Sequence, residues 1–332
     1  MRVLITAPIT ESGLNELKDA GLEVDYRSWL ETGNLHLGES LLQTIKSRNY
    51  EIIIVEGDEI KEEIIEQTEL KLIGSVRGSP NNISLQAATV KKIPVIAAPG
   101  RNTIAVAELT IALMLAQARN IIAAERLLKS EFFIDDFKDF GNMYKNLMGF
   151  ELSGRTVGLI GLGQIGYEVA KRLHSFSVEI LVFDPYVDSN KIEKVDGRSV
   201  ELDELLRTSD IISIHCPSTD ETKGMLGAKE FEKMKKTAIL INTARASVLN
   251  EYALREALKN GTIAGAGLDV FFMEPVDSDN EFLELDNVTV MPHMGGNTIE
   301  TLERQTRIIV DNVLAFVKGE QPKNILNPEV YE

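Results

Sequence analysis

The chain has 332 residues, which is enough for about two domains of ordinary size. Acidic residues outnumber basic residues 51 to 35, and the formal net charge of −16 excludes the basic surface of an unaided nucleic-acid or anionic-membrane binder. The single cysteine, Cys216, cannot form an internal disulfide, and no Cys/His spacing is typical of a metal site. No apolar run is long enough for a signal peptide or a membrane span, so we expect a cytoplasmic protein.

In the first hundred residues, short β-rich runs alternate with amphipathic stretches, which is the pattern of a parallel sheet covered by helices. A first helix is expected over Thr10–Ala20, with Thr10 as the N-cap and Gly21 as the stop signal. The expected strands are Arg2–Thr6, Glu51–Val55, Leu70–Ser75 and Pro94–Ala97.

A long helix is expected from Thr103 to Lys129, and its apolar residues exceed one narrow stripe, so we expect burial on more than one side. The segment 130–149, which includes Phe132 and Phe133, is the least regular part of the chain. An exposed arm that packs on a second subunit and a plain surface loop are both compatible with it.

From residue 155 onward the alternation resumes and predicts a second parallel sheet. A last helix, about Thr298 to Lys318, carries apolar residues spaced to dock on a neighbouring element. The expected strands are Thr156–Ile160, Glu179–Phe183, Ile211–His215, Ala238–Asn242, Gly265–Asp269 and Val288–Met291.

A glycine-rich loop follows the first strand of this second sheet and precedes a helix. Gly161 permits a tight turn, Gly163 lets the backbone approach a pyrophosphate, and Gly166 allows close contact between helix and strand. Asp184 closes the next strand, where a carboxylate accepts hydrogen bonds from ribose hydroxyls and repels a 2′-phosphate. The pattern therefore favours NAD over NADP, and the alternative is a tight turn whose glycines serve packing only.

Four polar side chains stand at or after the carboxyl ends of predicted strands of the second sheet, where ligands of doubly wound sheets gather. They are Arg245, Asp269, Glu274 and His293. His36 and His174 lie outside this pattern, and we interpret them as surface or structural histidines.

An arginine, a carboxylate and a histidine beside a nicotinamide are the groups that a 2-hydroxy acid/2-oxo acid pair requires. Arg245 can hold a substrate carboxylate with its planar guanidinium, and His293 can exchange the hydroxyl proton during hydride transfer. Glu274, if it bonds to His293, raises the pKa of the imidazole. The spacing of these three residues in the sequence is equally compatible with an alternative, in which they are unrelated charged residues on the surface.

These segments, taken in order, resemble the NAD-dependent D-isomer-specific 2-hydroxyacid dehydrogenase family. The resemblance implies an α/β fold of two doubly wound parallel-sheet domains. A Rossmann-type NAD domain, residues 101–293, would be inserted into a flavodoxin-like catalytic domain formed by residues 1–100 and 294–332. The matching segments are Asn102–Glu108, the glycine loop, His215–Pro217 with Thr219 and Thr222, Asn242–Arg245, Gly267–Pro275, and Pro292–Gly296.

The resemblance also implies roles for further residues, and a homodimer joined through the NAD domains. It supports the catalytic roles of Arg245, Glu274 and His293. Substrate contacts are implied for Arg77, Gly78, Ser79 and Asn102. Cofactor contacts are implied for Gly161, Gly163, Gln164, Ile165, Gly166, Asp184, His215, Pro217, Thr222, Thr243, Ala244, Asp269, Gly295 and Gly296.

The chain departs from the family pattern at several positions. Ala246 replaces a glycine after the catalytic arginine, and Pro80 removes a backbone donor from the substrate loop. Glu56 and Asp58 stand where phosphoglycerate-specific members tend to carry an arginine, and we expect both to repel a phosphate. Since the sequence ends at Glu332, we expect no counterpart of the C-terminal regulatory domain found in some serine-pathway members.

We therefore expect an NAD-dependent enzyme that acts on a small anionic 2-hydroxy or 2-oxo acid and works as a 2-oxo acid reductase in the cell. A 3-phosphoglycerate dehydrogenase is the nearest enzymatic alternative, and oxidation of another anion such as phosphite is a further one. A non-catalytic NAD-sensing protein is the alternative from another class. We interpret Cys216 as a packed residue near the adenine side.

Overall fold

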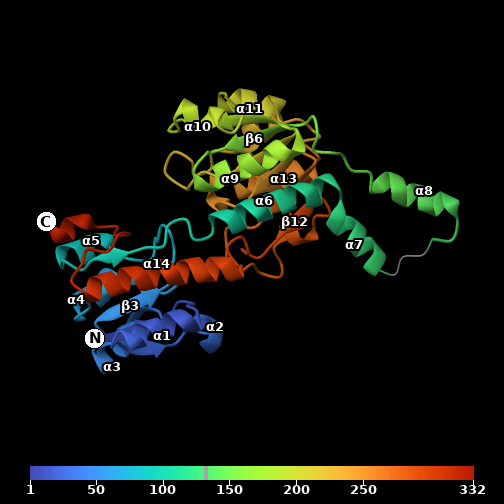
Figure 1. The fold of residues 1–332 in the computed structure, drawn as a ribbon. Helices are drawn as coiled ribbons and strands as arrows, with labels where there is room; N and C mark the ends of the chain where they lie inside the picture. The colour runs from blue at the N-terminus through green and yellow to red at the C-terminus, as the bar shows by residue number, and fades with distance from the viewer. Residues whose placement is uncertain (131–133) are drawn as a thin grey trace. The chain divides into compact units, whose positions relative to one another are not determined.

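The computed structural model describes residues 1–130 and 134–332, which form two units. Unit 1 comprises Met1–Arg101 and Asn297–Glu332, and unit 2 comprises Asn102–Gly296. Each unit contains one parallel sheet with helices between its strands, which confirms the predicted α/β class (Figure 1). From the sequence, the boundaries between the two domains were expected after residues 100 and 293, within three residues of these.

The sheet of unit 1 has five parallel strands in the order β2-β1-β3-β4-β5, which is the flavodoxin-like order. Its topological switch point lies between β1 and β3. All four residues of β3 are buried apolar side chains, as expected for a central parallel strand covered on both faces. The strands are β1 Arg2–Ile5, β2 Glu23–Tyr26, β3 Ile52–Val55, β4 Leu72–Ser75 and β5 Val95–Ile96.

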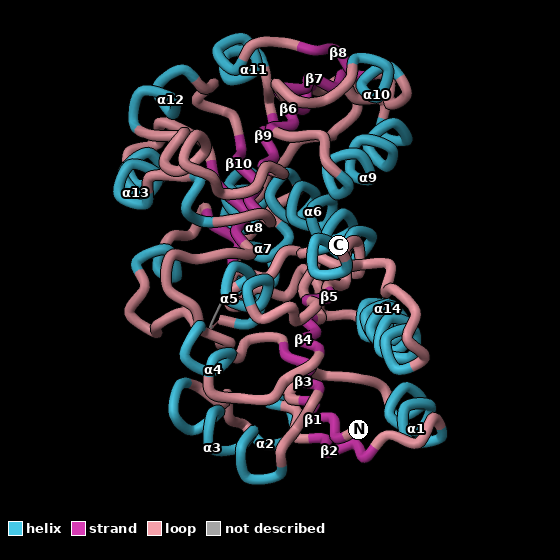
Figure 2. Tube along the Cα trace, turned by 90° about the vertical axis from the view of Figure 1, so that its left-hand side faces the viewer, coloured by secondary structure: helices cyan, strands magenta, loops and turns pink. Residues whose placement is uncertain are grey.

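Helices cover both faces of this sheet and form a hydrophobic core on each face. Alternate residues of β1 belong to one core or to the other. Val3 and Ile5 pack with α1 and α14, whereas Leu4 packs with α3 and α4. Figure 2 shows these two pairs of helices on opposite sides of the sheet. Thr10 caps α1 by accepting a hydrogen bond from the Gly13 N–H, which confirms the predicted cap. The helices are α1 Glu11–Asp19, α2 Trp29–Thr32, α3 Gly38–Arg48, α4 Glu62–Glu66, α5 Leu85–Val90 and α14 Ile299–Val317, and a 3₁₀ turn forms at Pro328–Tyr331.

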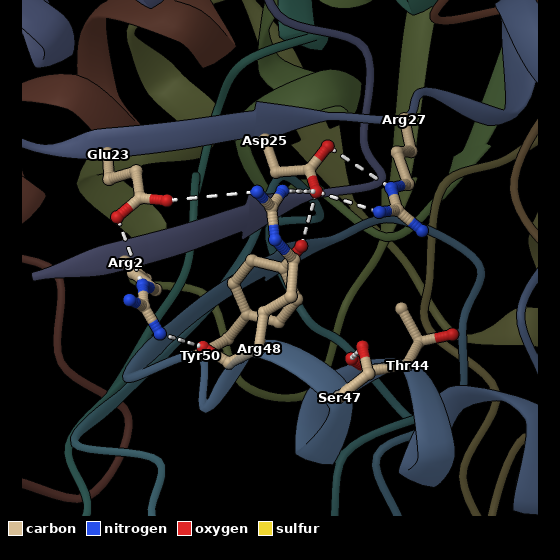
Figure 3. Close-up of polar contacts among 8 residues, drawn as sticks. All are labelled: Arg2, Glu23, Asp25, Arg27, Thr44, Ser47, Arg48 and Tyr50. Atoms are coloured by element: carbon tan, nitrogen blue, oxygen red, sulfur yellow. Dashed lines mark hydrogen bonds and ion pairs between the residues drawn. The ribbon is translucent and has the colours of Figure 1, made fainter.

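The edge strand β2 was not predicted, because its sequence is polar and its residues are only partly buried. Asp25 on this strand accepts hydrogen bonds from Arg27 at 2.8 and 3.1 Å, from Arg48 at 3.0 Å and from the Tyr50 hydroxyl (Figure 3). The Arg27 guanidinium is the largest cause that lowers the pKa of Asp25 to about 2. Ionic side chains therefore stabilise this edge of the sheet.

The sheet of unit 2 has seven parallel strands in the order β12-β11-β10-β9-β6-β7-β8, with its switch point between β6 and β9. Each of the six strands expected in this part of the chain is present, and β8 at the edge was not predicted. The strands are β6 Thr156–Ile160, β7 Glu179–Phe183, β8 Gly197–Ser199, β9 Ile211–Ile214, β10 Ile239–Asn242, β11 Gly265–Leu268 and β12 Val288–Val290.

Helices also cover both faces of the second sheet. Helices α6 and α9 pack on one face, and α11, α12 and α13 pack on the other (Figure 2). The helices are α6 Thr103–Ala118, α9 Gln164–Leu173, α10 Ser189–Glu193, α11 Leu202–Thr208, α12 Ala228–Lys233 and α13 Glu251–Lys259, and 3₁₀ turns form at His174–Phe176, Ala246–Val248 and Glu281–Glu284.

The single long helix predicted over 103–129 is wrong, because the chain bends by 64° between α6 and a separate helix α7, Ile121–Lys129. Asn120 adopts a left-handed conformation (φ 49°) at the break, which asparagine tolerates better than most residues. Helix α6 is buried on more than one side, as predicted. Within the described residues, only this bent pair reaches the length and apolar character of a bilayer-spanning segment.

The segment 130–149 is more regular than the sequence suggested. Helix α8 spans Phe137–Asn146 and begins at Asp136, whose carboxylate accepts from the N–H groups of Lys138 and Asp139 at 2.8 Å. A plain surface loop therefore does not describe residues 137–146, and an exposed arm that packs on a second subunit stays a prediction. Figure 1 shows α7 and α8 extending away from the seven-stranded sheet. Phe132 and Phe133 lie outside the described residues.

Candidate active site

The glycine loop joins β6 to α9, and its geometry explains each glycine. Gly161 has a φ of 95°, and a Cβ there would lie 2.8 Å from the backbone nitrogen of Cys216. A Cβ on Gly166 would lie 2.3 Å from the carbonyl oxygen of Gly161, so only glycine allows this approach of helix to strand. Gly163 faces open space and is exposed. The loop therefore leaves room for a phosphate beside the N-terminus of α9.

Asp184 stands at the end of β7, next to this loop. Its Oδ2 accepts from the N–H of Leu162 at 2.7 Å, and its Oδ1 accepts from the N–H of Tyr186 at 3.0 Å. The carboxylate is thus fixed at the position where a ribose hydroxyl of NAD would donate to it. The glycine cradle and this carboxylate together fit NAD.

The residues after β9 support the cofactor side of the site in different ways. His215 bonds through Nε2 to the Ser213 hydroxyl at 2.9 Å, while its buried Nδ1 has no partner in the described structure. Burial lowers the pKa of this imidazole, so it is neutral at pH 7. Thr222 donates to the carbonyl oxygen of Pro217 at 2.6 Å and so shapes the turn that follows.

The other predicted cofactor residues are engaged within the protein to different degrees. The Thr243 hydroxyl is buried and bonds to that of Thr110 at 2.8 Å, and the Ala244 N–H donates to the Asn242 side chain at 3.0 Å. The Thr243 hydroxyl and the Ala244 N–H are therefore already hydrogen-bonded within the protein, and any contact of these two residues with a cofactor would use their other atoms. Gln164 is exposed at the start of α9, and Ile165 packs against the core.

His293 and Glu274 form the polar centre of the site. His293 Nδ1 and Glu274 Oε2 lie 2.6 Å apart, and Glu274 Oε1 accepts from the Phe271 N–H at 3.0 Å. His293 itself has a left-handed backbone (φ 57°), and its side chain remains about half exposed. The histidine is therefore fixed at one ring nitrogen and accessible from solvent.

The two side chains shift each other's protonation toward an ion pair. The hydrogen bond that His293 donates to Glu274 is the largest cause that raises the pKa of His293, and burial opposes it less strongly. Burial acts to raise the pKa of Glu274, but the bonds from His293 and Phe271 outweigh it, and the net shift is downward. The geometry favours an imidazolium near neutral pH.

Asp269 supports the loop that carries His293. Its carboxylate accepts from the N–H of Met294 at 2.7 Å and from the N–H of Gly295 at 2.8 Å. Burial is the main cause that raises the pKa of Asp269. A Cβ on Gly295 would lie 2.8 Å from this carboxylate, and one on Gly296 would lie 3.2 Å from the Asn102 amide. No pattern in the sequence indicated this support, because it depends on two loops that are distant in the chain.

Arg245 follows β10, so the structure brings it together with Glu274 and His293, which follow the neighbouring strands β11 and β12. Its guanidinium is exposed and donates to the Ala244 carbonyl at 2.7 Å. Its charge acts to lower the pKa of both Glu274 and His293, which places it within electrostatic reach of both. An anion can approach this guanidinium directly.

The predicted substrate residues of unit 1 follow β4. The backbone N–H of Arg77 donates to the Ser75 hydroxyl at 3.1 Å, and its guanidinium donates to Asn81 at 3.3 Å. Gly78 packs closely on the backbone, because a Cβ there would lie 3.2 Å from the Pro99 Cα. Ser79 is exposed at this carboxyl edge, whereas Asn102 belongs to unit 2 and precedes α6.

The expectation that Asp58 repels a phosphate is wrong. Asp58 is fully buried, and its carboxylate accepts from the Thr6 hydroxyl at 2.6 Å and from the His36 N–H at 2.7 Å. The side chain therefore holds the loops at the switch point together. Glu56 is also not a lone negative charge, since it pairs with Arg101 at 2.8 Å.

Cys216 is partly buried, and burial raises the pKa of its thiol to about 11. Both observations are consistent with a packed residue, because a thiol with a raised pKa is a weak nucleophile at neutral pH.

Within residues 1–130 and 134–332, no three His, Cys, Asp or Glu side chains are arranged to hold a metal ion.

A Rossmann sheet with a dinucleotide loop, an exposed arginine and a carboxylate-supported histidine at its carboxyl edge defines the NAD domain of an oxidoreductase. The family model described as "D-isomer specific 2-hydroxyacid dehydrogenase, NAD binding domain" matches residues 111–295. The chain belongs to this family of NAD-dependent enzymes.

Individual relatives extend the similarity to nearly the whole chain. A D-3-phosphoglycerate dehydrogenase of Archaeoglobus fulgidus is 38% identical over 98% of this chain, which spans 59% of that protein. A glyoxylate reductase of Thermofilum pendens is 38% identical over 99% of this chain and 95% of its own length. The crystal structure of the TT0316 protein from Thermus thermophilus superposes with a TM-score of 0.85 at 32% identity, covering 98% of this chain and 100% of its own.

Proposed function

We propose that the chain reduces a small, unphosphorylated 2-oxo acid of the glyoxylate or hydroxypyruvate type to the D-2-hydroxy acid, with NADH as the reductant. The observation that carries this proposal is the 2.6 Å contact between His293 and Glu274 beside the exposed Arg245. An imidazolium and a guanidinium at one edge supply a proton donor and a carboxylate anchor together.

The roles of the residues follow from their positions. Bound NADH supplies the hydride that the carbonyl carbon receives. Arg245 binds the substrate carboxylate and polarises the 2-oxo group, and His293 donates its proton to the developing alkoxide oxygen. Glu274 keeps His293 protonated before the transfer and holds the ring in one orientation. In the reverse direction, the neutral imidazole accepts the hydroxyl proton.

The choice of an unphosphorylated acid is supported by two observations. Relatives named glyoxylate reductase match 99% of this chain at 33 to 38% identity. Glu56 also places a carboxylate at the carboxyl edge of unit 1, where it neutralises Arg101. The 38% identity to a D-3-phosphoglycerate dehydrogenase makes the phosphorylated acid the second candidate.

NADH oxidation by the purified protein tests the proposal, with glyoxylate, hydroxypyruvate, pyruvate, longer 2-oxo acids and 3-phosphohydroxypyruvate as substrates. We expect the largest kcat/KM for glyoxylate or hydroxypyruvate. Preferred turnover of the phosphorylated acid would overturn the substrate assignment and keep the reaction. Binding of NADH without turnover of any acid would overturn the reaction and favour an NAD-sensing protein.

We also propose that the chain forms a homodimer through unit 2. Helices α7 and α8 expose apolar side chains, and the Phe137 side chain is 92% accessible. Exposing several apolar side chains to water is energetically unfavourable, and a cluster of them is typical of a protein–protein interface. The exposed apolar residues of these two helices are Ile121, Leu128, Phe137, Phe140 and Tyr144, and the exposed Ile134 and Met148 flank α8.

A further inference from the structure

Lys191, on the short helix α10, places its ammonium group against the glycine loop. Its Nζ donates to the carbonyl oxygen of Leu162 at 2.7 Å and lies 3.3 Å from that of Gly163, to which it also donates. The side chain of Asp188 caps α10, and the buried Ile192 anchors the helix to the core of unit 2. The half-buried lysine is therefore fixed beside the loop and is not a freely moving surface side chain.

A second contact ties the same ammonium group to α9. The Nζ of Lys191 lies 5.5 Å from the centre of the Tyr167 ring, which is within the range of a cation–π interaction. The backbone N–H of Tyr167 also donates to the Gly163 carbonyl at 3.2 Å, so Lys191 and the first turn of α9 share this acceptor. The two carbonyls and the ring are neutral, and these contacts leave the positive charge of Lys191 uncancelled.

The two carbonyl contacts determine how the loop presents its backbone N–H groups. The peptide bonds 162–163 and 163–164 are trans, so each carbonyl points away from the N–H of the next residue. Since both carbonyls point to Lys191, the N–H groups of Gly163 and Gln164 lie on the side that faces away from it. These groups at the start of α9 have no acceptor within the helix, and successive N–H groups of this kind bind anions.

Lys191 also completes a clamp on the residue between the first two glycines. Asp184 accepts from the N–H of Leu162 at 2.7 Å, and Lys191 donates to the carbonyl of the same residue. The chain has a net charge of −16, and Asp184 adds a carboxylate close to the loop, so the electrostatic field of the protein opposes a negatively charged diphosphate. The ammonium group of Lys191 counteracts this field where the diphosphate binds.

We propose that Lys191 is a positioning residue for the cofactor, which holds the glycine loop in the form that binds the diphosphate of NAD and adds a positive charge beside it. The glycine pattern in the sequence does not indicate this lysine, because it lies beyond the next strand, on a separate helix. The inference concerns the cofactor alone, so it applies whichever 2-oxo acid the chain reduces.

The binding test needs no turnover and uses isothermal titration calorimetry of the full chain with ADP-ribose and with adenosine. Lys191→Met removes the ammonium group and keeps the length of the side chain. We expect it to raise the Kd of ADP-ribose by about fivefold to tenfold, which is the order of one charge contact at a partly exposed site. The Kd of adenosine, which carries no phosphate, should stay unchanged. Lys191→Arg keeps a charged donor and should restore most of the affinity for ADP-ribose.

Lys171→Met is the matched control. Lys171 lies 5.9 Å from the centre of the same Tyr167 ring, but it pairs with Glu168 at 2.9 Å and belongs to α9 itself. Removing this second ammonium group should leave the Kd of ADP-ribose unchanged.

Salt and kinetics provide two further measurements. The Kd of ADP-ribose should rise less steeply with NaCl concentration in Lys191→Met than in the wild-type chain, because salt screens a charge contact that the variant lacks. With a 2-oxo acid that the chain reduces, the KM for NADH should rise by a factor similar to that of the Kd and should account for most of the loss in kcat/KM.

Thermal melts establish that each variant is folded, and Lys191→Gln, which removes the charge but keeps a donor, is the second variant. An unchanged Kd of ADP-ribose in the folded Lys191 variants overturns the proposal. Equal losses for ADP-ribose and adenosine indicate a general distortion of the loop, and an equal loss in Lys171→Met indicates a general effect of surface charge, so each of these results overturns it as well. Normal ADP-ribose binding by a wild-type chain that reduces no 2-oxo acid overturns the proposed function and leaves the role of Lys191 to these titrations.

Discussion

Glu274 and His293 follow neighbouring strands of the seven-stranded sheet, and their side chains meet with 2.6 Å between Oε2 and Nδ1. The contact links a carboxylate supported by the Phe271 N–H to a histidine on a loop supported by Asp269. The pair therefore rests on backbone from two loops, which is the kind of support that a proton donor needs.

His293→Ala removes the proton donor. We expect kcat for 2-oxo acid reduction to fall by about two to four orders of magnitude, which is the usual contribution of a general acid–base group. NADH binding, measured by the fluorescence of the bound nucleotide, should stay close to that of the wild-type chain. An unchanged kcat would remove His293 from the mechanism.

Glu274→Gln tests the electrostatic role of the carboxylate. Glu274 raises the pKa of His293, so the imidazolium needed for reduction persists to higher pH in the wild-type chain. Without the charge, the pKa of His293 falls, and kcat/KM for reduction should begin to decline at lower pH. The pH profile distinguishes this from simple misfolding, which lowers the rate at every pH. Identical profiles for the two proteins would contradict the assignment.

Asp184→Arg changes the cofactor preference. The substitution removes the acceptor of the ribose hydroxyls and adds a partner for a 2′-phosphate, so KM for NADH should rise and that for NADPH should fall. Asp184 also accepts from the N–H groups of Leu162 and Tyr186. Asp184→Asn is therefore the control, because it keeps an acceptor for the loop and removes only the charge. An unchanged NADH/NADPH ratio in Asp184→Arg would exclude the ribose role.

Asp25→Asn weakens the edge of the sheet in unit 1. The pKa of Asp25 is lowered to about 2, so its contribution is present at pH values above its unfolded pKa and is lost as the pH falls through about 2. At pH 7 the variant should lose about 2 kcal/mol of unfolding free energy. Urea unfolding followed by Trp29 fluorescence reports on unit 1. The difference between the two proteins should shrink toward pH 2, and a constant difference would indicate a packing effect instead.

Phe137→Asp/Phe140→Asp places two charges on the exposed apolar face of α8. If this face forms the dimer interface, the variant should elute at half the mass of the wild-type chain in size-exclusion chromatography with light scattering. Asn142→Asp adds a charge to an exposed polar position of the same helix and should leave the mass unchanged. A wild-type chain that is monomeric at micromolar concentration would contradict the dimer.

The sequence by itself determined the features that depend on local patterns. The glycine loop, the central strands and the cap at Thr10 follow from residues close together in the chain, since a turn, an apolar run or a cap satisfies its backbone locally. The polar residues after β10, β11 and β12 were recognisable because parallel strands bring their carboxyl ends to one edge.

Only the tertiary structure decided which of these polar groups reach a ligand and which support the fold. Asp58 and Glu56 are two residues apart in the chain, yet one is fully buried between Thr6 and His36, and the other pairs with Arg101. The edge strand β2 and the break at Asn120 also escaped prediction. In each case the outcome depends on partners from distant segments, because burial and charge pairing are properties of the packed chain and not of the local sequence.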